Sequence, residues 1–480
     1  MRQLIGGEWI DSRNGRVFDS VSPWSGEVVA TVAAGDQDDT RAAIEAAQQA
    51  FGPWSESLPH ERQGIFLRAA DELERRGDEV IALLAHETGC TRHFADIQLE
   101  FALSLLRQSA ALPYASQGQL LPSDLPGTRA MAVRRPVGVV GAIAPWNAAL
   151  TLSSRAVAGP IALGNTVVLK PSEHAPACGA LLAEVFVAAG LPPGVLNLVT
   201  HGPGEAAFVG EELIANPLVR RINFTGSTTT GRRLAEAAGR HLKRMLLQLG
   251  GHNPLIVLDG VDLDYAVDAA VFGSFVHQGQ VCMCARRIYV ERPIAEEFSE
   301  RFAARAASLP VGDPADPETV IGPVISRWAL STIARRVEEA VAHGARVLAG
   351  GEARPPCYPA TVLVDVPPDV ELAFDETFGP VVVIDAVEDR DEAVRRANAS
   401  AFGMNAAVLA ADAAQGMEVA RRLDAGIVHV NDQTVNDEPQ MPFGGTKDSG
   451  WGSFGVGFAV DEFTELQWVT TRDAPRPFPF

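Results

Sequence analysis

Val137-Gly138-Val139-Val140 begins a part of the chain in which short β-branched runs alternate with helical stretches. Thr166-Val167-Val168-Leu169 precedes a predicted helix over 177–189, and Val195-Leu196-Asn197-Leu198-Val199 precedes another. Strands that alternate with helices across short loops are typical of an α/β domain with a largely parallel sheet. The sequence therefore predicts the α/β class from about residue 136 onward.

Predicted elements also lie on both sides of this part. Upstream, apolar residues recur at near-helical spacing and predict helices over 38–51 and 59–89. Downstream, a second α/β stretch follows residue 250, and a cleft between two such domains is where small-molecule sites concentrate. Its expected elements are strands at 255–258, 287–290 and 381–384 and helices at 295–308 and 326–343.

Two further segments, 129–134 and 463–469, alternate like strands and fit neither α/β stretch. We expect them to form a flap that pairs with another subunit.

The totals describe a folded, acidic protein. Of its 480 residues, 47% are hydrophobic and 21% are charged, as in ordinary soluble proteins. Lysine and arginine total 40 against 60 aspartates and glutamates, which gives a net charge of −20. Such a surface repels nucleic-acid phosphates and anionic membranes, so we expect neither as a partner.

A cytoplasmic location is also expected. The N-terminus lacks the apolar core and cleavage site of a signal peptide. The uncharged stretch 136–154 has Pro145, Trp146 and Asn147 at its centre, which favours a strand, a loop and a helix over a membrane span. Five cysteines, an odd number, indicate free thiols in a reducing compartment.

A candidate nucleophile lies in Gly279-Gln280-Val281-Cys282-Met283-Cys284-Ala285. A cysteine among glycines and small residues indicates a tight pocket lined by backbone. Upstream, Leu247-Gln248-Leu249-Gly250-Gly251 places a neutral amide where a reaction through a thioester would need a base. No metal site is predicted at Cys282 and Cys284, because further ligands close by in sequence are lacking.

Three other motifs follow predicted strands, and each has a plainer structural reading. Phe224-Thr225-Gly226-Ser227-Thr228-Thr229-Thr230-Gly231 opens a helix expected from Arg232 to Leu247, where free N–H groups either bind a pyrophosphate or form an ordinary cap. Lys170-Pro171-Ser172-Glu173 either brackets a ribose or forms a solvated turn. Ala144-Pro145-Trp146-Asn147 offers an amide either to an oxyanion or to its own turn.

Taken in order, these segments resemble the aldehyde dehydrogenase superfamily over nearly the whole chain. The resemblance implies a Rossmann-like NAD-binding domain over 1–120 and 139–250 and an α/β catalytic domain over 251–450. It also implies a small β bridging flap over 121–138 and 451–480, and with it a homodimer or homotetramer. The matching motifs are Pro145-Trp146-Asn147, Lys170-Pro171-Ser172-Glu173, Phe224-Thr225-Gly226-Ser227, Leu249-Gly250-Gly251, Gly279-Gln280-Val281-Cys282, Glu376-Thr377-Phe378-Gly379-Pro380 and 442–450.

The resemblance also implies the roles of single residues. Cys282 matches the family's nucleophile and Asn147 its oxyanion donor. Glu376 matches the contact to the nicotinamide ribose, with Phe378 packed beside it. Glu173 would repel a 2′-phosphate, so NAD is expected rather than NADP. The other cofactor contacts implied are Trp146, Lys170, Pro171, Ser172, Thr225, Gly226, Ser227, Gly231, Leu249 and Gly250.

Elementary chemistry agrees with these roles. A cysteine thiol has a pKa near ~8.5 and reacts as the thiolate, so the pocket has to favour that form. Attack on an aldehyde gives a thiohemiacetal oxyanion, held by Asn147 and a backbone N–H. Its collapse expels hydride to NAD and leaves a thioester, from which water must release the acid.

The chain departs from the family at Gln248, where a glutamate usually acts as the base for that water. Losing a general base typically costs ~10²–10⁴ in rate, roughly 3–5 kcal/mol of barrier. Three readings stay open. Glu376 or Glu438 deprotonates a water that Gln248 positions, the acyl group passes to coenzyme A, or the chain is a slow dehydrogenase or a binding scaffold.

Within the superfamily, the stretch 430–443 and the C-terminal part resemble the benzaldehyde, salicylaldehyde and vanillin dehydrogenases. Ala148 stands where phenylalanine is common, and a small residue beside Asn147 leaves room for a flat ring. Arg155 either meets a ring substituent or forms a structural salt bridge. We therefore expect an aromatic aldehyde as substrate.

Overall fold

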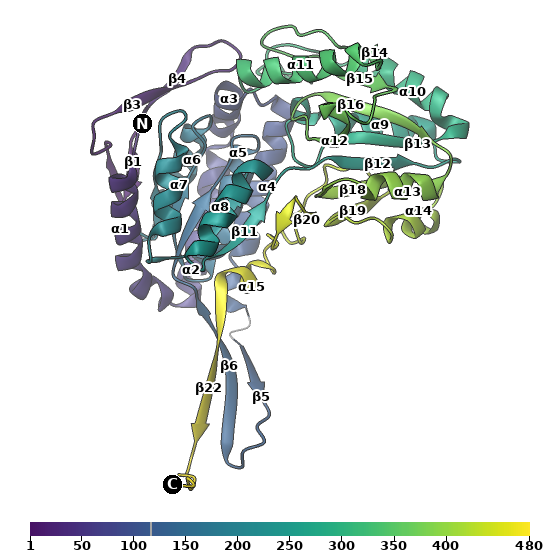
Figure 1. The fold of residues 1–480 in the computed structure, drawn as a ribbon. Helices are drawn as coiled ribbons and strands as arrows, with labels where there is room; N and C mark the ends of the chain where they lie inside the picture. Colours follow the sequence, from purple (N-terminus) through teal and green to yellow (C-terminus); the bar gives the residue numbers. More distant parts are fainter. Residues whose placement is uncertain (116–117) are drawn as a thin grey trace.

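The protein folds into two lobes with a narrow arm extending from the first (Figure 1). The computed structural model describes residues 1–115 and 118–480. Residues 116 and 117, within the predicted segment 1–120, lie outside the described residues.

The first lobe is built on an eight-stranded sheet in the order β2-β1-β9-β8-β7-β10-β11-β21. Its centre, β9 to β11, is parallel, as the alternation of strands and helices predicted. Both faces of these central strands are covered, which explains their continuous apolar runs. The strands are β1 (Gln3–Ile5), β2 (Glu8–Ile10), β7 (Val139–Ile143), β8 (Thr166–Lys170), β9 (Leu196–Leu198), β10 (Val219–Thr225), β11 (Arg244–Gln248) and β21 (Gly450–Trp451).

Helices pack on the two faces of this sheet. One apolar cluster joins α1, α7 and α8 to one face, and a larger cluster joins α2 to α6 to the other. The helices are α1 (Gln37–Ser55), α2 (Pro59–Arg75), α3 (Gly77–Thr88), α4 (Arg92–Ser109), α5 (Ala149–Ala162), α6 (Pro176–Ala188), α7 (Ala206–Ala215) and α8 (Thr228–Arg240). Short elements at the edge of the lobe are β3 (Val17–Val21), β4 (Val28–Ala33) and the 3₁₀ helix η1 (Leu112–Tyr114).

Two of the predicted helices are wrong in extent. The region 59–89 forms two helices, α2 and α3, separated at Arg76. The helix expected from Arg232 to Leu247 ends at Arg240, because Leu242 turns the chain with a φ of 52°. The buried run that follows is the strand β11, so Gln248 ends a strand beside β10 rather than following a helix.

The second lobe carries a seven-stranded sheet in the order β14-β15-β16-β13-β12-β18-β19, parallel except at β14. The division predicted at residue 250 falls between β11 and β12, which belong to different sheets. The strands are β12 (Asn253–Val257), β13 (Ala285–Glu291), β14 (Arg346–Ala349), β15 (Thr361–Val364), β16 (Val381–Val387), β18 (Asn405–Leu409) and β19 (Ile427–Val430). The helices are α9 (Leu263–Phe275), η2 (Val276–Gly279), α10 (Arg292–Ala307), α11 (Arg327–Ala342), α12 (Glu371–Phe374), α13 (Arg390–Asn398) and α14 (Ala413–Ala420).

The chain returns from the second lobe to the first through residues 431–458, the return segment, which pairs with both lobes. Its strand β20 (Thr446–Lys447) pairs with β17 (Phe402–Gly403), and the next strand, β21, pairs with β11. This return segment therefore lies against the strand that ends in Gln248. It continues into the short helix α15 (Ala459–Phe463).

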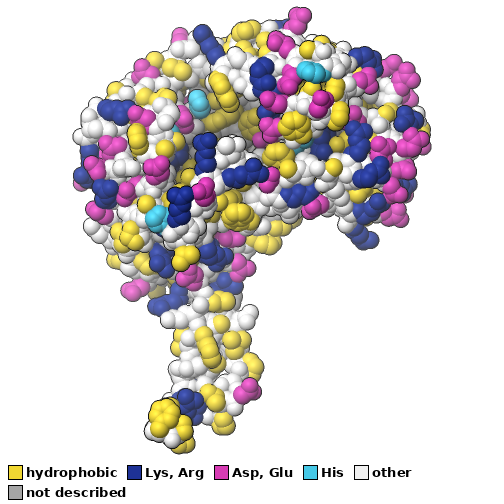
Figure 2. Space-filling view, viewed as in Figure 1, with side chains coloured by type: hydrophobic (Ala, Val, Ile, Leu, Met, Phe, Trp, Pro, Cys, Tyr) yellow, Lys and Arg dark blue, Asp and Glu magenta, His cyan; other side chains and the backbone are white. Residues whose placement is uncertain are grey.

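The arm is a three-stranded sheet in the order β22-β6-β5. It joins β22 (Thr464–Arg472) antiparallel to β6 (Thr128–Pro136), and β5 (Gly118–Leu121) completes it. The two segments singled out as strand-like thus pair with each other. Figure 2 shows apolar side chains and few charged ones on the arm. Leu120 in β5 and Trp468 in β22 are apolar residues of the arm and are 83% and 77% exposed.

In the part of the chain that the structure describes, no helix combines the length and hydropathy that a membrane crossing requires.

Candidate active site

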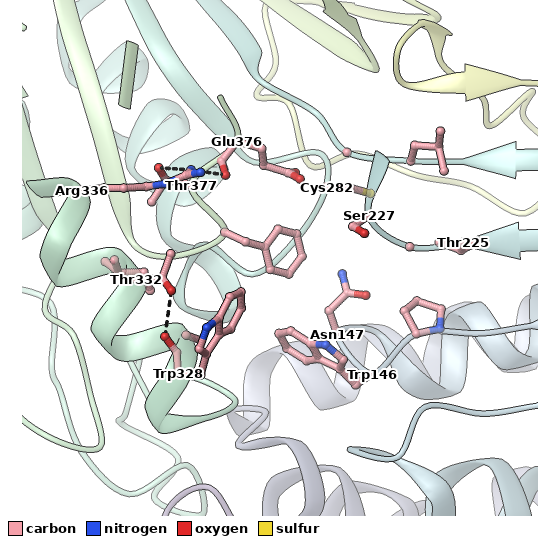
Figure 3. A pocket seen from close by; sticks show the side chains of 17 residues that line it. Trp146, Asn147, Thr225, Ser227, Cys282, Trp328, Thr332, Arg336, Glu376 and Thr377 are labelled. Atoms are coloured by element: carbon pink, nitrogen blue, oxygen red, sulfur yellow. Dashed lines mark hydrogen bonds between the residues drawn. The ribbon is translucent and has the colours of Figure 1, made fainter. Parts of the chain in front are cut away.

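A cavity of about 320 Å³ lies between the two lobes (Figure 3). The first lobe contributes the loops that follow β7, β10 and β11, which are the carboxyl ends of neighbouring parallel strands. The second lobe contributes the segment before β13, one face of α11, and the segment before β16. The lining residues are Pro145, Trp146, Asn147, Thr225, Gly226, Ser227, Leu249, Gly250, Cys282, Trp328, Ala329, Thr332, Ile333, Arg336, Glu376, Thr377 and Phe378.

Ten of the sequence-predicted site residues meet in this cavity, and six lie elsewhere. Gln248 is buried behind the wall at the end of β11, and Gly231 packs against Leu249 inside α8. Lys170 ends β8, and Pro171, Ser172 and Glu173 follow it.

Cys282 is half-buried and sits after a constrained turn. His277 and Gln278 both have left-handed backbone, with φ of 51° and 54°. Gln278 Nε2 holds the turn by donating to the carbonyl oxygens of Gly89 and Pro323, at 2.8 and 3.0 Å. Strained backbone of this kind is concentrated at functional sites, where packing maintains it.

Burial raises the pKa of the Cys282 thiol to about 12, and the charge of Glu376 acts in the same direction. The thiolate that attacks a carbonyl therefore needs help to form. A positive charge next to the sulfur, or a proton acceptor, would supply it.

Asn147 follows β7, as expected, and its side chain is buried in the wall of the cavity that also contains Cys282 (Figure 3). Its Nδ2 donates to the carbonyl oxygen of Gln280 at 3.0 Å. This bond fixes the amide and leaves its second N–H for another acceptor. The arrangement suits a donor to an oxyanion that develops beside the sulfur.

Glu376 also lies in the wall of this cavity. Its Oε1 accepts a hydrogen bond from the N–H of Gly251 at 3.0 Å. Arg336 fixes the adjoining backbone, since its Nη1 donates to the Glu376 carbonyl oxygen at 2.6 Å and its Nη2 to Asp375 at 2.6 Å. Burial raises the pKa of the Glu376 carboxyl to about 7, so the group exchanges a proton near neutral pH.

Gln248 is only 1% exposed and is tied to the return segment. Its Nε2 donates to the carbonyl oxygens of Phe443 and Gly452, at 3.0 and 3.4 Å. Its Oε1 has no hydrogen-bond partner among the described residues. The amide can thus offer one acceptor to a water, but it cannot take up a proton.

The loops at this cavity fit a bound dinucleotide. Ser227 is the N-cap of α8, so the free N–H groups of that helix start at the cavity wall. A Cβ on Gly250 would come within 2.5 Å of Glu376 Oε2, and one on Gly226 within 2.5 Å of the Phe224 ring. The wall therefore depends on glycines where backbone approaches closely, as a pyrophosphate cradle does.

Lys170 and Glu173 lie beyond this cavity, where β8 ends. Burial lowers the pKa of the Lys170 ammonium to about 8. Burial raises the pKa of the Glu173 carboxyl, but the charge of Lys170 and other contacts outweigh it, so the net shift is downward. Glu173 also lines a separate cavity of about 580 Å³. An ammonium and a carboxylate are thus held together at a strand end.

A buried aromatic and charged cluster lies near Cys282. Arg155 Nη2 donates to Asp437 at 2.6 Å, and the Arg155 guanidinium stacks 4.7 Å from the Phe101 ring centroid and 4.1 Å from that of Phe443. The charges of Arg155 and Asp437 both act on the Cys282 thiol. Asp437 and Phe443 line another cavity, of about 330 Å³, formed by residues 426–443.

The contribution of α11 to the cavity could not be seen in the sequence. Trp328, Ala329, Thr332, Ile333 and Arg336 lie on a single face of that helix. No sequence motif marks these five residues, and their helical spacing is the only signal that could have identified them. The partners of two predicted residues were likewise not visible in the sequence: His201 lies beside Lys170, and Asp437 lies beside Arg155.

The comparisons with known proteins agree with this geometry. The profile described as "Aldehyde dehydrogenase family" matches residues 9–469. Vanillin dehydrogenase of Pseudomonas fluorescens is 45% identical, with 99% of this chain and 98% of that protein covered. Benzaldehyde dehydrogenase [NAD(+)] of Pseudomonas putida is 40% identical, with 100% and 98% covered. The crystal structure of a salicylaldehyde dehydrogenase from Pseudomonas putida G7 complexed with salicylaldehyde has a TM-score of 0.97 at 40% identity, covering 100% of this chain and 99% of that one.

Proposed function

The chain belongs to the aldehyde dehydrogenase family of NAD(P)-dependent oxidoreductases, and we propose that it oxidises an aromatic aldehyde to the carboxylic acid with NAD. The observation that carries the proposal is the meeting of Cys282, Asn147 and Glu376 in one cavity at the carboxyl ends of parallel strands. Membership in a family of oxidoreductases argues against a binding scaffold.

The first half of the reaction uses Cys282 and Asn147. The Cys282 thiol gives up its proton to solvent, the thiolate sulfur bonds to the aldehyde carbon, and the carbonyl electrons move onto oxygen. The free N–H of the Asn147 amide stabilises that oxyanion. Bound NAD would supply the hydride acceptor, and loss of hydride from the substrate carbon leaves an acyl thioester on the Cys282 sulfur.

The second half needs a base for water, and Gln248 cannot be that base. Of the two carboxylates considered, Glu376 lines the cavity that contains Cys282, whereas Glu438 is exposed in the wall of the cavity formed by 426–443. We assign the base to Glu376, whose pKa of about 7 makes it half-ionised at neutral pH. Gln248, buried behind the cavity wall, keeps one unpartnered acceptor, Oε1, with which it would orient the same water. Water then adds to the acyl carbon, the C–S bond breaks, and the acid leaves.

The preference for an aromatic ring is supported by what surrounds Cys282. Cys282 packs against an extended apolar cluster whose members include Phe101, Ala148 and Phe443. Small Ala148 leaves room next to Asn147, and the rings of Phe101 and Phe443, on which Arg155 stacks, belong to the same cluster. The vanillin, benzaldehyde and salicylaldehyde dehydrogenases found as relatives have the same kind of substrate in their names.

Steady-state kinetics test this function. NADH formation should show a higher kcat/KM for benzaldehyde and vanillin than for hexanal, and Cys282→Ser should abolish it for all three. A higher value for hexanal would reject the aromatic preference. Turnover that requires added coenzyme A would instead support transfer of the acyl group to coenzyme A. This alternative stays open because Gln248 cannot act as a base.

We also propose that the arm pairs with a second copy of the chain, giving a homodimer or homotetramer. Its exposed apolar residues, such as Leu120, Leu466 and Trp468, would be covered in such a pairing. Light scattering on the purified protein measures the state directly, and a monomer would reject the pairing. The five unpaired cysteines fit the cytoplasmic location that we propose for it.

A further inference from the structure

His201, which no motif singled out, completes a buried polar cluster beside Lys170. Lys170 ends β8, and His201 follows the neighbouring parallel strand β9. The two side chains are 6% and 1% exposed by residue, and Lys170 Nζ lies 2.7 Å from His201 Nε2. Lys170 Nζ also donates to the carbonyl oxygen of Pro171 at 3.0 Å.

The hydrogen bonds define which ring nitrogen of His201 carries the proton. His201 Nδ1 lies 2.9 Å from the carbonyl oxygen of Gly202, which can only accept, so Nδ1 is the donor. Nε2 then has a lone pair and accepts from the Lys170 ammonium. Burial, followed by the charge of Lys170, lowers the pKa of His201, so the ring is neutral at pH 7. The neutral His201 ring therefore accepts a hydrogen bond from Lys170 and offers no positive charge to a phosphate.

This arrangement limits what Lys170 can offer a ligand. An ammonium has three N–H donors, and two are directed at Pro171 and His201. Glu173 lies beside the cluster, with its Oε2 3.9 Å from His201 Nε2, and provides a charged acceptor. One donor and one acceptor match the two hydroxyls of a ribose. A 2′-phosphate would find a single free N–H and would face the charge of Glu173.

We propose that His201 is a positioning residue that aims the Lys170 ammonium at the ribose hydroxyls and thereby selects NAD over NADP. The inference rests on the proposed function, because the ribose site is itself part of that proposal. The other charged groups that act on the cluster are Glu205, which pairs with Arg16, and His174, whose charge acts on Glu173.

Substitution of His201 tests this directly. In His201→Leu, Lys170 loses a charge-assisted hydrogen bond, so we expect the dissociation constant for NAD, measured by calorimetry, and the KM for NAD both to rise about tenfold, and kcat to stay within about twofold. Because the released ammonium can reach a 2′-phosphate, kcat/KM for NADP should change less, and the NAD-to-NADP ratio should fall about tenfold. His201→Gln, whose Oε1 can accept from Lys170, should retain the wild-type ratio.

A pH profile separates positioning from a general structural role. The pKa of Lys170 is about 8, so the KM for NAD should rise as the ammonium is lost above that pH. Without the acceptor on His201 the charged form is less stable, so this rise should begin at lower pH in His201→Leu. A purely structural role would leave the profile in place.

The outcomes are distinct. If His201→Leu does not fold, His201→Asn replaces it, because its shorter amide cannot reach Lys170, and the same fall in the ratio is expected. An unchanged NAD-to-NADP ratio and pH profile in a folded variant would overturn the inference. Failure of the wild type to reduce or bind NAD, measured by absorbance and calorimetry, would instead reject the proposed function.

Discussion

Replacement of Glu376 by glutamine tests how the acyl enzyme is released without a glutamate at 248. The new amide keeps an oxygen that can accept from the N–H of Gly251, which donates to the carboxylate at 3.0 Å, so the loop should hold its shape. The exchange also removes a negative charge that raises the pKa of the Cys282 thiol, so formation of the thioester should not slow. Only the hydrolysis of the thioester by water loses its base. We expect a fall in the steady-state rate of ~10²–10⁴, roughly 3–5 kcal/mol of barrier.

Rapid mixing with saturating NAD and vanillin separates the two halves of the reaction. Glu376→Gln should give a full burst, one NADH per site, followed by a very slow phase. In the wild type the slow phase should fall about tenfold per pH unit below pH 7, because the carboxylate is the base and its pKa is about 7. The variant should lack this dependence.

The matched control moves the base back to position 248. In the double variant Glu376→Gln, Gln248→Glu, the new carboxyl meets the carbonyl oxygens of Phe443 and Gly452, which raises its pKa. The slow phase should therefore recover, chiefly at alkaline pH. Glu376 is not the base if Glu376→Gln leaves the slow phase unchanged, or if it removes the burst at saturating NAD.

Three further substitutions have expected outcomes. Ala148→Phe should lower kcat/KM for vanillin at least about tenfold and affect hexanal less, as measured by NADH formation; equal losses would contradict the room assigned to a ring. Asp437→Asn should destabilise the fold by about 3–5 kcal/mol, because it leaves the Arg155 charge buried and unpaired; an unchanged denaturation midpoint would show that the pair matters little. Gly250→Ala places a Cβ 2.5 Å from a carboxylate oxygen of the cavity, so NAD affinity should fall, whereas Gly239→Ala, with nothing within 4 Å, should have no effect.

The α/β class and the chemistry-bearing loops could be predicted because they rest on local patterns. Buried parallel strands are apolar on both faces, and the loops after them carry Asn147 and Ser227. The extent of the helix before Gln248 could not be predicted in this way. Arg232 to Leu247 suits a helix locally, and only the pairing of β11 with β10 and β21 decides that its end is a strand.

Contacts between segments that lie far apart in the chain could not be predicted from the sequence either. His201 meets Lys170 because β8 and β9 are neighbours, and Asp437 meets Arg155 across most of the chain. Trp328 and Arg336 reach the cavity because α11 packs beside it. Such partners depend on how the two sheets are assembled, and no spacing within one element encodes that assembly.

Mass spectrometry of the acid-quenched Glu376→Gln protein, after mixing with vanillin and NAD, shows whether Cys282 carries the acyl group. We expect the peptide containing Cys282 to gain the mass of the vanilloyl group in step with the NADH burst. If NADH forms while that peptide stays unmodified, oxidation does not pass through a thioester on Cys282.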